Sequence, residues 1–164
     1  MISRKKTLVV ILLLLTCVSC DQATKVIAKA SLPFYTTYTF FNDILRLQYA
    51  ENSGGMMSLG AGLPAEVRFW FLTVFVGLML AGILLFALFS KRLSRFQIAG
   101  LTLIVGGGLS NLVDRLRNDG HVIDFVTIGI GTVRTAIFNL ADVTILAGTL
   151  LLILSVTAIR REPL

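Results

Sequence analysis

The sequence predicts an integral membrane protein of the all-α class, a four-helix transmembrane bundle that carries a small extracytoplasmic β-sheet. Two observations predict it. Of 164 residues, 55% are hydrophobic and only 15% are charged, and the mean hydropathy is +0.85. Soluble domains of this size are far less apolar. The hydrophobic residues also fall into four separate blocks, whereas about 20 apolar residues suffice for one helical span.

The four predicted spans cover residues 7–27, 69–89, 96–114 and 140–159. The first block is continuously apolar only from Thr7 to Cys20, so this span reaches the required length only if it continues past Asp21. Two longer segments, about 29–67 and 115–139, connect the first span to the second and the third span to the fourth, and both lie on the same side of the membrane. Together these parts form a single domain, residues 1–164.

Basic residues indicate how the chain is oriented. They cluster at 4–6, at 91–95 and at 160–161, and a four-span arrangement puts all three clusters on one side. Because cytoplasmic loops are enriched in Lys and Arg, both termini are predicted to be cytoplasmic. Eight of the nine acidic residues lie in or beside the two outer segments. The net charge of +6 therefore reflects membrane orientation and does not indicate a nucleic-acid partner.

The stretch LTCVSCDQATK, residues 15–25, resembles a lipoprotein cleavage site, in which Cys20 would become a lipid-bearing N-terminus. The chain enters the membrane three more times, however, so we expect the first span to be retained. A Cys-x-x-Cys pair inside an apolar helix favours packing over redox chemistry. Asp21 and Lys25, four residues apart, could form an ion pair on the helix surface.

The outer segments show strand patterns. Leu45, Leu47 and Tyr49 alternate with residues 46, 48 and 50, which indicates a half-buried strand, and residues 51–55 end it with turn-forming types. Two further strands are predicted at 122–128 and 132–138, joined by residues 129–131. We expect a small sheet that covers the outer ends of the helices.

Four short polar motifs interrupt these apolar surroundings: Asn52-Ser53-Gly54, Asn111 to Arg115, Asp124, and Asn139 to Asp142. Some have structural explanations. Asn52 suits a turn, and Asn139 could cap the fourth helix while Asp142 reaches back to it. Asp124 is different, because it lies between Ile123 and Phe125 close to the membrane. An ionisable group at such a position is a functional candidate.

Asp124 and Asp142 both map to the outer membrane boundary. Two facing carboxyls cannot both ionise readily, so they would share a proton, as in aspartic proteases. Other chemistries find less support: His121 has no cysteine near it for a metal site, and Ser58 and Ser110 lack an obvious base. From these patterns alone, an aspartic hydrolase, a small transporter and a structural membrane protein all remain open.

Five motifs, in order along nearly the whole chain, resemble those of the lipoprotein signal peptidase (signal peptidase II) family. They are Asp21-Gln22-x-Thr24-Lys25, Asn52-x-Gly54, Gly106-Gly107-Gly108-x-x-Asn111-Leu112-x-Asp114-Arg115, Asp124-Phe125, and Phe138-Asn139-x-Ala141-Asp142. One departure is visible. The family usually has Ala-Ala-Phe-Ser after the second motif, where this chain has Gly55-Met56-Met57-Ser58.

The resemblance implies a multi-pass aspartic endopeptidase of the bacterial inner membrane. It would remove signal peptides from diacylglyceryl-modified prolipoproteins by cutting before the lipidated Cys, at the extracytoplasmic face. Asp124 and Asp142 would activate the water, and Asn52, Asn111, Arg115 and Asn139 would position the substrate. We expect Asp21, Lys25, Gly54 and Asp114 to maintain the architecture.

We expect prolipoproteins and membrane lipids as the partners of a monomeric enzyme, with neither a metal nor an organic cofactor. A non-catalytic paralogue or a small transporter of the same topology is the alternative.

Overall fold

A computed structural model describes residues 4–159 and contains four long helices. The helices are α1 (Arg4–Ser31), α4 (Arg95–Arg117), α5 (Leu140–Ile159) and a continuous second helix formed by α2 (Ala65–Arg68), the π-helix η2 (Phe69–Phe75) and α3 (Val76–Phe89). All four are long and apolar enough to cross a membrane. The helices begin or end a few residues beyond the predicted spans, except for α5. The basic cluster at 160–161 lies outside the described residues.

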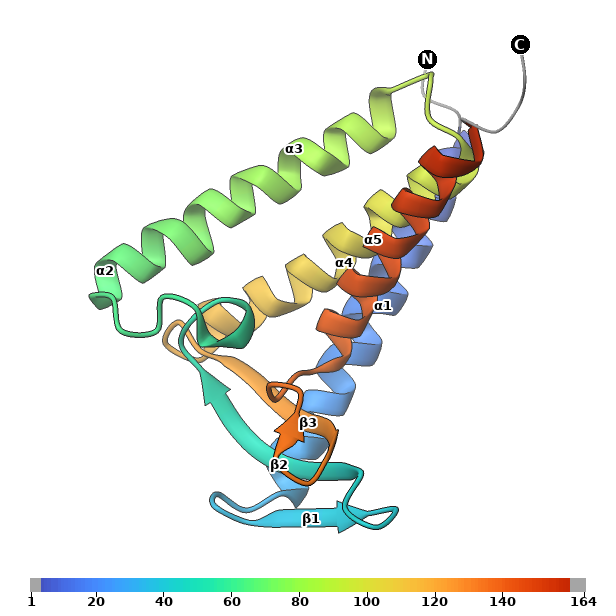
Figure 1. Cartoon of the computed structure of the whole chain (residues 1–164). Helices are drawn as coiled ribbons and strands as arrows, with labels where there is room; N and C mark the ends of the chain where they lie inside the picture. The colour runs from blue at the N-terminus through green and yellow to red at the C-terminus, as the bar shows by residue number, and fades with distance from the viewer. Residues whose placement is uncertain (1–3, 160–164) are drawn as a thin grey trace.

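The helices converge at one end of the molecule and spread apart toward the other, and the sheet lies at this other end (Figure 1). The start of α1, the end of α5 and the connection between α3 and α4 lie at the opposite end. Lys6 Nζ donates to Ser90 O over 2.8 Å and ties α1 to that connection. Ser94 and Gln97 then start α4 with a reciprocal capping box, which satisfies free backbone N–H groups of the first turn.

Helix α4 is the central helix, and its glycines 106–108 explain why. Successive residues of an α-helix point in directions about 100° apart, so three consecutive glycines open three sides of α4. A Cβ at each position would collide with a different neighbour. In order, these neighbours are Cys17 on α1, Ala141 on α5 and Leu80 on α3. The three helices therefore approach α4 at one level.

The sheet has four antiparallel strands in the order β1 (Thr37–Phe40), β2 (Leu45–Asn52), β3 (Val122–Ile130) and β4 (Val133–Arg134). The prediction of a small sheet is confirmed, but three details were wrong. Strand β1 was not predicted. Strand β2 continues through Asn52 instead of ending before it.

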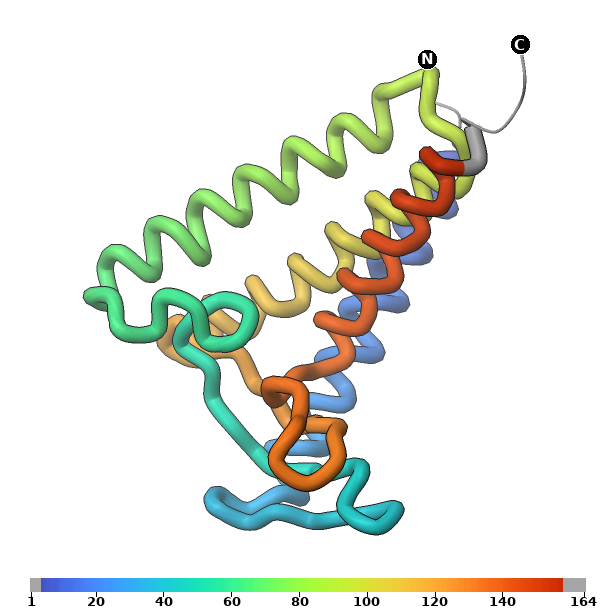
Figure 2. The backbone as a smooth tube through the Cα atoms, in the orientation of Figure 1, coloured from blue at the N-terminus to red at the C-terminus, as the bar shows by residue number. Residues whose placement is uncertain are grey.

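The third error concerns the predicted strand 132–138, which is reduced to β4 and an isolated bridge between Phe138 and Val126. The reason is the side chain of Thr135. Its Oγ1 accepts the backbone N–H of Ile128 over 3.0 Å and so takes the place of a backbone acceptor in the ladder. The chain then leaves the sheet and turns toward α5, as the backbone tube shows (Figure 2).

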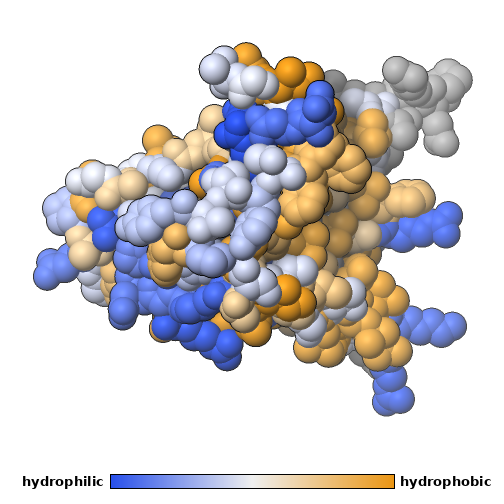
Figure 3. Space-filling view, turned by 90° about the horizontal axis from the view of Figure 1, so that it is seen from below, coloured by the Kyte–Doolittle hydropathy of each residue, from blue (hydrophilic) through white to orange (hydrophobic). Residues whose placement is uncertain are grey.

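Polar and apolar surfaces separate along the molecule. Seen from the sheet end, hydrophilic and weakly polar side chains gather over the outer segments, while hydrophobic side chains surround them (Figure 3). The helices expose many large apolar side chains, among them Leu78 (69% exposed), Phe86 (57%) and Leu154 (64%). Such exposure is expected where lipid, and not water, is the solvent.

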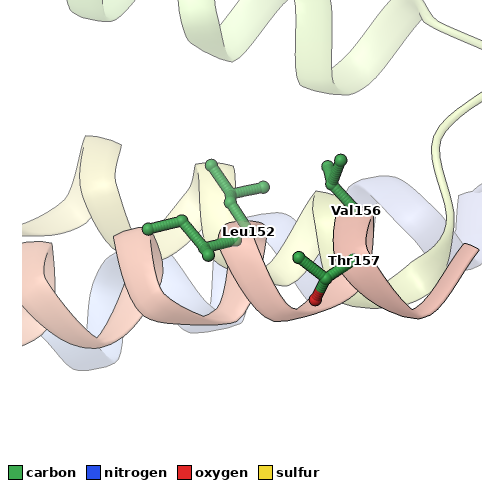
Figure 4. Close-up of a pocket in the computed structure, with 4 residues that line it drawn as sticks. Leu152, Val156 and Thr157 are labelled. Carbon is green, nitrogen blue, oxygen red and sulfur yellow. The ribbon is translucent and has the colours of Figure 1, made fainter. Parts of the chain in front are cut away.

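A recess of about 390 Å³ lies on α5 and is lined by Leu152, Ile153, Val156 and Thr157. Leu152 and Val156 point to the side on which α3 runs (Figure 4). This recess is apolar and contains none of the candidate site residues, which lie at the sheet end of the molecule.

Candidate active site

Asp124 lies on β3 and is 3% exposed. Its partner across the ladder is Ala50, and a bulge in β2 lies just before that pair. Asn52 is diagonal to Asp124 on the same face of the sheet, because side chains two residues apart share a face. Asn52 Nδ2 accordingly donates to Asp124 Oδ2 over 3.1 Å.

Asp142 lies in the first turn of α5. Its Oδ2 accepts the backbone N–H of Asn139 over 3.1 Å, while Asn139 Oδ1 accepts the backbone N–H of Asp142 over 3.0 Å. The predicted reciprocal cap is therefore confirmed. The other oxygen, Oδ1, accepts from Asn111 Nδ2 over 3.0 Å. Capping does not exclude a second role, since only part of the carboxylate is used for the cap.

Asn139 connects the two aspartates. The bridge between Phe138 and Val126 brings the start of α5 against β3, and Asn139 follows directly. Its Nδ2 donates to Asp124 Oδ1 over 2.7 Å, and it also reaches Asn111 Oδ1 at 3.1 Å. Asn139 is 1% exposed. The predicted site residues from β2, α4, β3 and α5 thus form one hydrogen-bonded group.

Burial and, second, the nearby charge of Asp142 raise the pKa of Asp124 to about 6. The hydrogen bonds from Asn52 and Asn139 and the charge of Lys25 act in the opposite direction. A raised carboxyl pKa next to a second carboxyl is the arrangement that lets a pair hold one proton near neutral pH.

A second group lies between α1 and α4. Lys25 Nζ contacts Asp21 Oδ2 at 2.7 Å, Asp114 Oδ2 at 2.8 Å and Asn111 Oδ1 at 2.8 Å. The side chains of the three charged residues are at most 3% exposed. The interpretation of Asp21 and Lys25 as a pair on the helix surface is therefore wrong, because Asp114 from α4 completes a buried cluster.

The two carboxylates of this cluster also hold the neighbouring elements. Asp21 Oδ1 accepts the backbone N–H of Ala141 over 2.7 Å, and Asp114 Oδ2 accepts that of Ile123 over 3.1 Å. These bonds attach the start of α5 and the strand β3 to α1 and α4.

Two members of this cluster, Gln22 and Ser110, were missing from the predicted site. Gln22 Nε2 donates to Asp114 Oδ1 over 2.7 Å, and Ser110 Oγ donates to Asp21 Oδ2 over 2.7 Å. Helical spacing could have found them, because positions 21, 22 and 25 share one face of α1 and positions 110, 111 and 114 share one face of α4.

Arg115 lies beside the loop that follows β2. Its Nη2 donates to Gly54 O over 2.6 Å, whereas Nη1 is buried and has no hydrogen-bond partner within the described chain. Gly54 cannot carry a side chain, because a Cβ would lie 2.5 Å from the carbonyl carbon of Ser58. Its N–H donates to Asn52 Oδ1 over 2.9 Å, so the loop also orients Asn52.

Met57, which stands where the family usually has an aromatic residue, lies on this loop with a φ of 56° and is 73% exposed. The ring of His121 contacts the backbone, with its Nδ1 3.1 Å from Asn118 O. Within residues 4–159, no three His, Cys, Asp or Glu side chains are grouped to hold a metal ion.

Comparison with known proteins identifies the family. The family model described as signal peptidase (SPase) II matches residues 13–158. The lipoprotein signal peptidase of Syntrophus aciditrophicus is 33% identical over 143 residues, which cover 87% of this chain and 88% of that protein. The lipoprotein signal peptidase of Sphingopyxis alaskensis is 35% identical over 139 residues, covering 81% and 76%.

Solved structures share the fold. A bacterial membrane enzyme determined by the in meso method at 2.3 Å resolution superposes with a TM-score of 0.80 at 22% identity, covering 95% of this chain and 94% of that one. A second such structure, at 1.9 Å resolution, gives a TM-score of 0.74 at 24% identity, covering 90% and 92%. The predicted fold class and the resemblance are both confirmed.

Proposed function

Because this chain belongs to the signal peptidase II family, whose members remove signal peptides from prolipoproteins, we propose that Asp124 and Asp142 are its catalytic pair. They would activate a water that cleaves the peptide bond before the diacylglyceryl-modified Cys. No metal or organic cofactor takes part in this proposal.

One observation carries the proposal: the hydrogen bonds that these two aspartates accept come from amides and a backbone N–H, and not from cations. Within residues 4–159, neither forms an ion pair with a basic side chain. Their oxygens accept from Asn52, Asn111, Asn139 and a backbone N–H. Neutral donors orient a carboxyl without holding it permanently ionised, so such a pair can exchange a proton.

The proposed reaction begins with a water between the two carboxyls. The ionised member takes a proton from the water, whose oxygen attacks the scissile carbonyl, and the protonated member gives its proton to the carbonyl oxygen. Collapse of the tetrahedral intermediate then breaks the C–N bond: the aspartate that took the water proton gives it to the leaving nitrogen, and the other aspartate takes back a proton from a hydroxyl of the intermediate, which restores the starting pair. Such general acid–base catalysis contributes typically ~10²–10⁴-fold.

Substrate positioning is assigned to the polar side chains beside the pair. The buried Arg115 Nη1 is a donor without a partner in the described chain, and a backbone carbonyl of the substrate would satisfy it. Gly54 holds the other end of the guanidinium, so the free N–H has a fixed direction. Asn52, Asn111 and Asn139 complete the wall of the site.

We further propose that the sheet end faces the extracytoplasmic side and that the enzyme works as a monomer. The basic residues 4–6 and 91–95 lie near the opposite ends of the helices (Figure 1), where the positive-inside rule favours the cytoplasm. Reporter fusions after residue 93 should read cytoplasmic, and fusions near residues 62 and 120 should read external. An external reading at residue 93 would reverse this topology.

The test of the catalytic pair uses purified protein in detergent and a diacylated prolipoprotein, with the loss of the signal peptide measured by mass spectrometry. Asp124→Asn and Asp142→Asn should each lower turnover at least ~100-fold while substrate still binds. Asn and Asp cap helices about equally well. Near-normal turnover of Asp142→Asn would therefore leave only the capping role, and an inactive wild type would identify a non-catalytic paralogue.

A further inference from the structure

We propose that Lys25 is a positioning residue of the peptidase reaction. It fixes the amide of Asn111 so that Asp142 is held as the ionised, water-activating member of the pair and Asp124 carries the shared proton. This inference rests on the proposed catalytic pair and adds to it a role for a residue expected to be only structural.

The first step concerns the hydrogens of Lys25. An ammonium group has three N–H donors and accepts nothing. Its three contacts are Asp21 Oδ2, Asp114 Oδ2 and Asn111 Oδ1, all within 2.8 Å. Lys25 is 1% exposed, so water does not compete for these donors. The atom of Asn111 that faces Lys25 must therefore be its oxygen.

The second step follows from the planar amide of Asn111. Once Oδ1 faces Lys25, Nδ2 is directed to Asp142 Oδ1, at 3.0 Å. A flipped amide would bring its oxygen against the carboxylate and its NH₂ against the ammonium, which is unfavourable on both sides. Asn139 Nδ2 also donates to Asn111 Oδ1, but a neutral donor holds an oxygen less strongly than a cation does.

The third step concerns which aspartate ionises. Asp142 accepts from Asn111 Nδ2 and from a backbone N–H, lies in the first turn of a helix and is only partly buried. A helix N-terminus favours negative charge. Asp124 lies on a strand, is 3% exposed, and has a pKa raised to about 6 by burial and by the charge of Asp142. The proton therefore belongs on Asp124.

Other charged groups surround the pair, but only Lys25 contacts a side chain that bonds to Asp142. Arg115 interacts with both aspartates electrostatically, yet its observed hydrogen bond goes to Gly54 O. The charged groups that act on the pair are Lys25 from α1 and Arg115 from α4, and Lys25 is itself paired with Asp21 from α1 and Asp114 from α4.

The test compares pH profiles of kcat and KM for two variants. Lys25→Met removes the donor, and Lys25→Met combined with Asp114→Asn removes one charge of each sign, so that the buried cluster keeps its net charge. We expect kcat to fall at least ~10-fold with KM unchanged. The acid limb of the kcat profile should move to higher pH, because the water-activating carboxylate loses a directed hydrogen-bond donor.

Gln22→Met is the matched control. It also removes a donor from this cluster, since Gln22 bonds to Asp114 and Ser110, but it does not contact Asn111. Stability should fall while the acid limb stays in place. An unmoved limb in a folded charge-balanced variant would overturn the role of Lys25. Inactive Asp124→Asn and Asp142→Asn variants would still support the catalytic pair, so the two failures are distinguishable.

If neither Lys25 variant folds, the wild-type protein decides. Carboxyl ¹³C NMR of Asp-labelled protein, with Asp124 and Asp142 assigned, should show Asp142 ionised and Asp124 protonated at about pH 5. A proton on Asp142 at this pH would contradict the proposal.

Discussion

Two groups of carboxylates lie side by side in this molecule, one paired with a cation and the other bonded to neutral donors. Asp21 and Asp114 share the ammonium of Lys25, with distances of 2.7 and 2.8 Å. Within residues 4–159, Asp124 and Asp142 accept hydrogen bonds only from side-chain amides and a backbone N–H. Asn111 belongs to both groups, because its oxygen faces Lys25 and its nitrogen faces Asp142.

The difference in partners distinguishes carboxylates that stabilise the fold from carboxylates that can transfer a proton. A carboxylate paired with a buried cation stays ionised, and its loss leaves the cation uncompensated. A carboxylate pair held by neutral donors can gain and lose a proton while its surroundings stay in place. Burial alone does not distinguish the two, since Asp21, Asp114 and Asp124 are all at most 3% exposed.

The largest stability effect should come from the ion-paired group. Asp21→Asn removes one of the two carboxylates that share Lys25. Because Asp114 still pairs with the ammonium, we expect a loss of stability below the ~3–5 kcal/mol of a buried pair that is broken completely. Thermal unfolding in detergent should show the loss, while kcat per folded molecule changes little. A stable but inactive Asp21→Asn variant would break the comparison and move Asp21 into the chemistry.

Asp124→Asn should have the opposite effect on stability to Asp21→Asn and stabilise the protein at neutral pH. The folded-state pKa of Asp124, about 6, is above its ordinary value of 3.8, so the folded state binds more protons between these values. Stability of the wild type should therefore fall as pH rises from about 4 to about 6, by up to about 3 kcal/mol, and the variant should lack this fall. Unfolding temperatures across pH 4–8 measure it. A wild type whose stability rises over this range would contradict the raised pKa.

A smaller effect is expected at Asn52. Its hydrogen bond lowers the pKa of Asp124, so Asn52→Leu should raise that pKa and move the alkaline limb of the activity profile up by about one pH unit. Gln48→Leu on the same strand is the control, because Gln48 bonds to Thr37 at the far side of β2. Equal shifts in both variants would exclude a direct effect on Asp124.

The smallest effect should come from an ion pair at the surface. Asp43 and Arg46 are bonded at 2.6 and 2.7 Å, but both side chains are at least one-third exposed. Exposed pairs are screened by water and salt. Asp43→Asn keeps a residue type that tolerates the φ of 68° and should leave the unfolding temperature and the turnover unchanged. A clear loss of either would show that this turn supports the site.

Much of this architecture was readable from the sequence because a membrane makes polar residues conspicuous. Asn111, Asp124 and Asp142 stand out in apolar surroundings, and their positions at the outer boundary indicate one site. The four helices were predicted from the apolar blocks, although all but α5 extend a few residues beyond the predicted spans.

What could not be read are the contacts between distant segments. Nothing near Lys25 in sequence indicates that Asp114 and Asn111 complete its cluster. The strand predicted through Thr135 is interrupted because its side-chain oxygen, and not a backbone oxygen, accepts the N–H of Ile128 across the turn. This contact cannot be read from the local sequence. Strand β1 has a short polar-aromatic sequence, and its pairing with β2 defines it.

The spacing of the buried cluster also sets the order in which its charges meet during synthesis. Asn111 follows Lys25 by 86 residues, so at ~5–20 residues per second the ribosome needs ~4–17 seconds to supply it. During that interval α1 enters the membrane without α4. The Asp21–Lys25 pair lies within one helix, so the two charged residues of the span 7–27 balance each other before α4 is made. The intrahelical pair thus lowers the cost of placing these two charges in lipid until Asp114 and Asn111 are available.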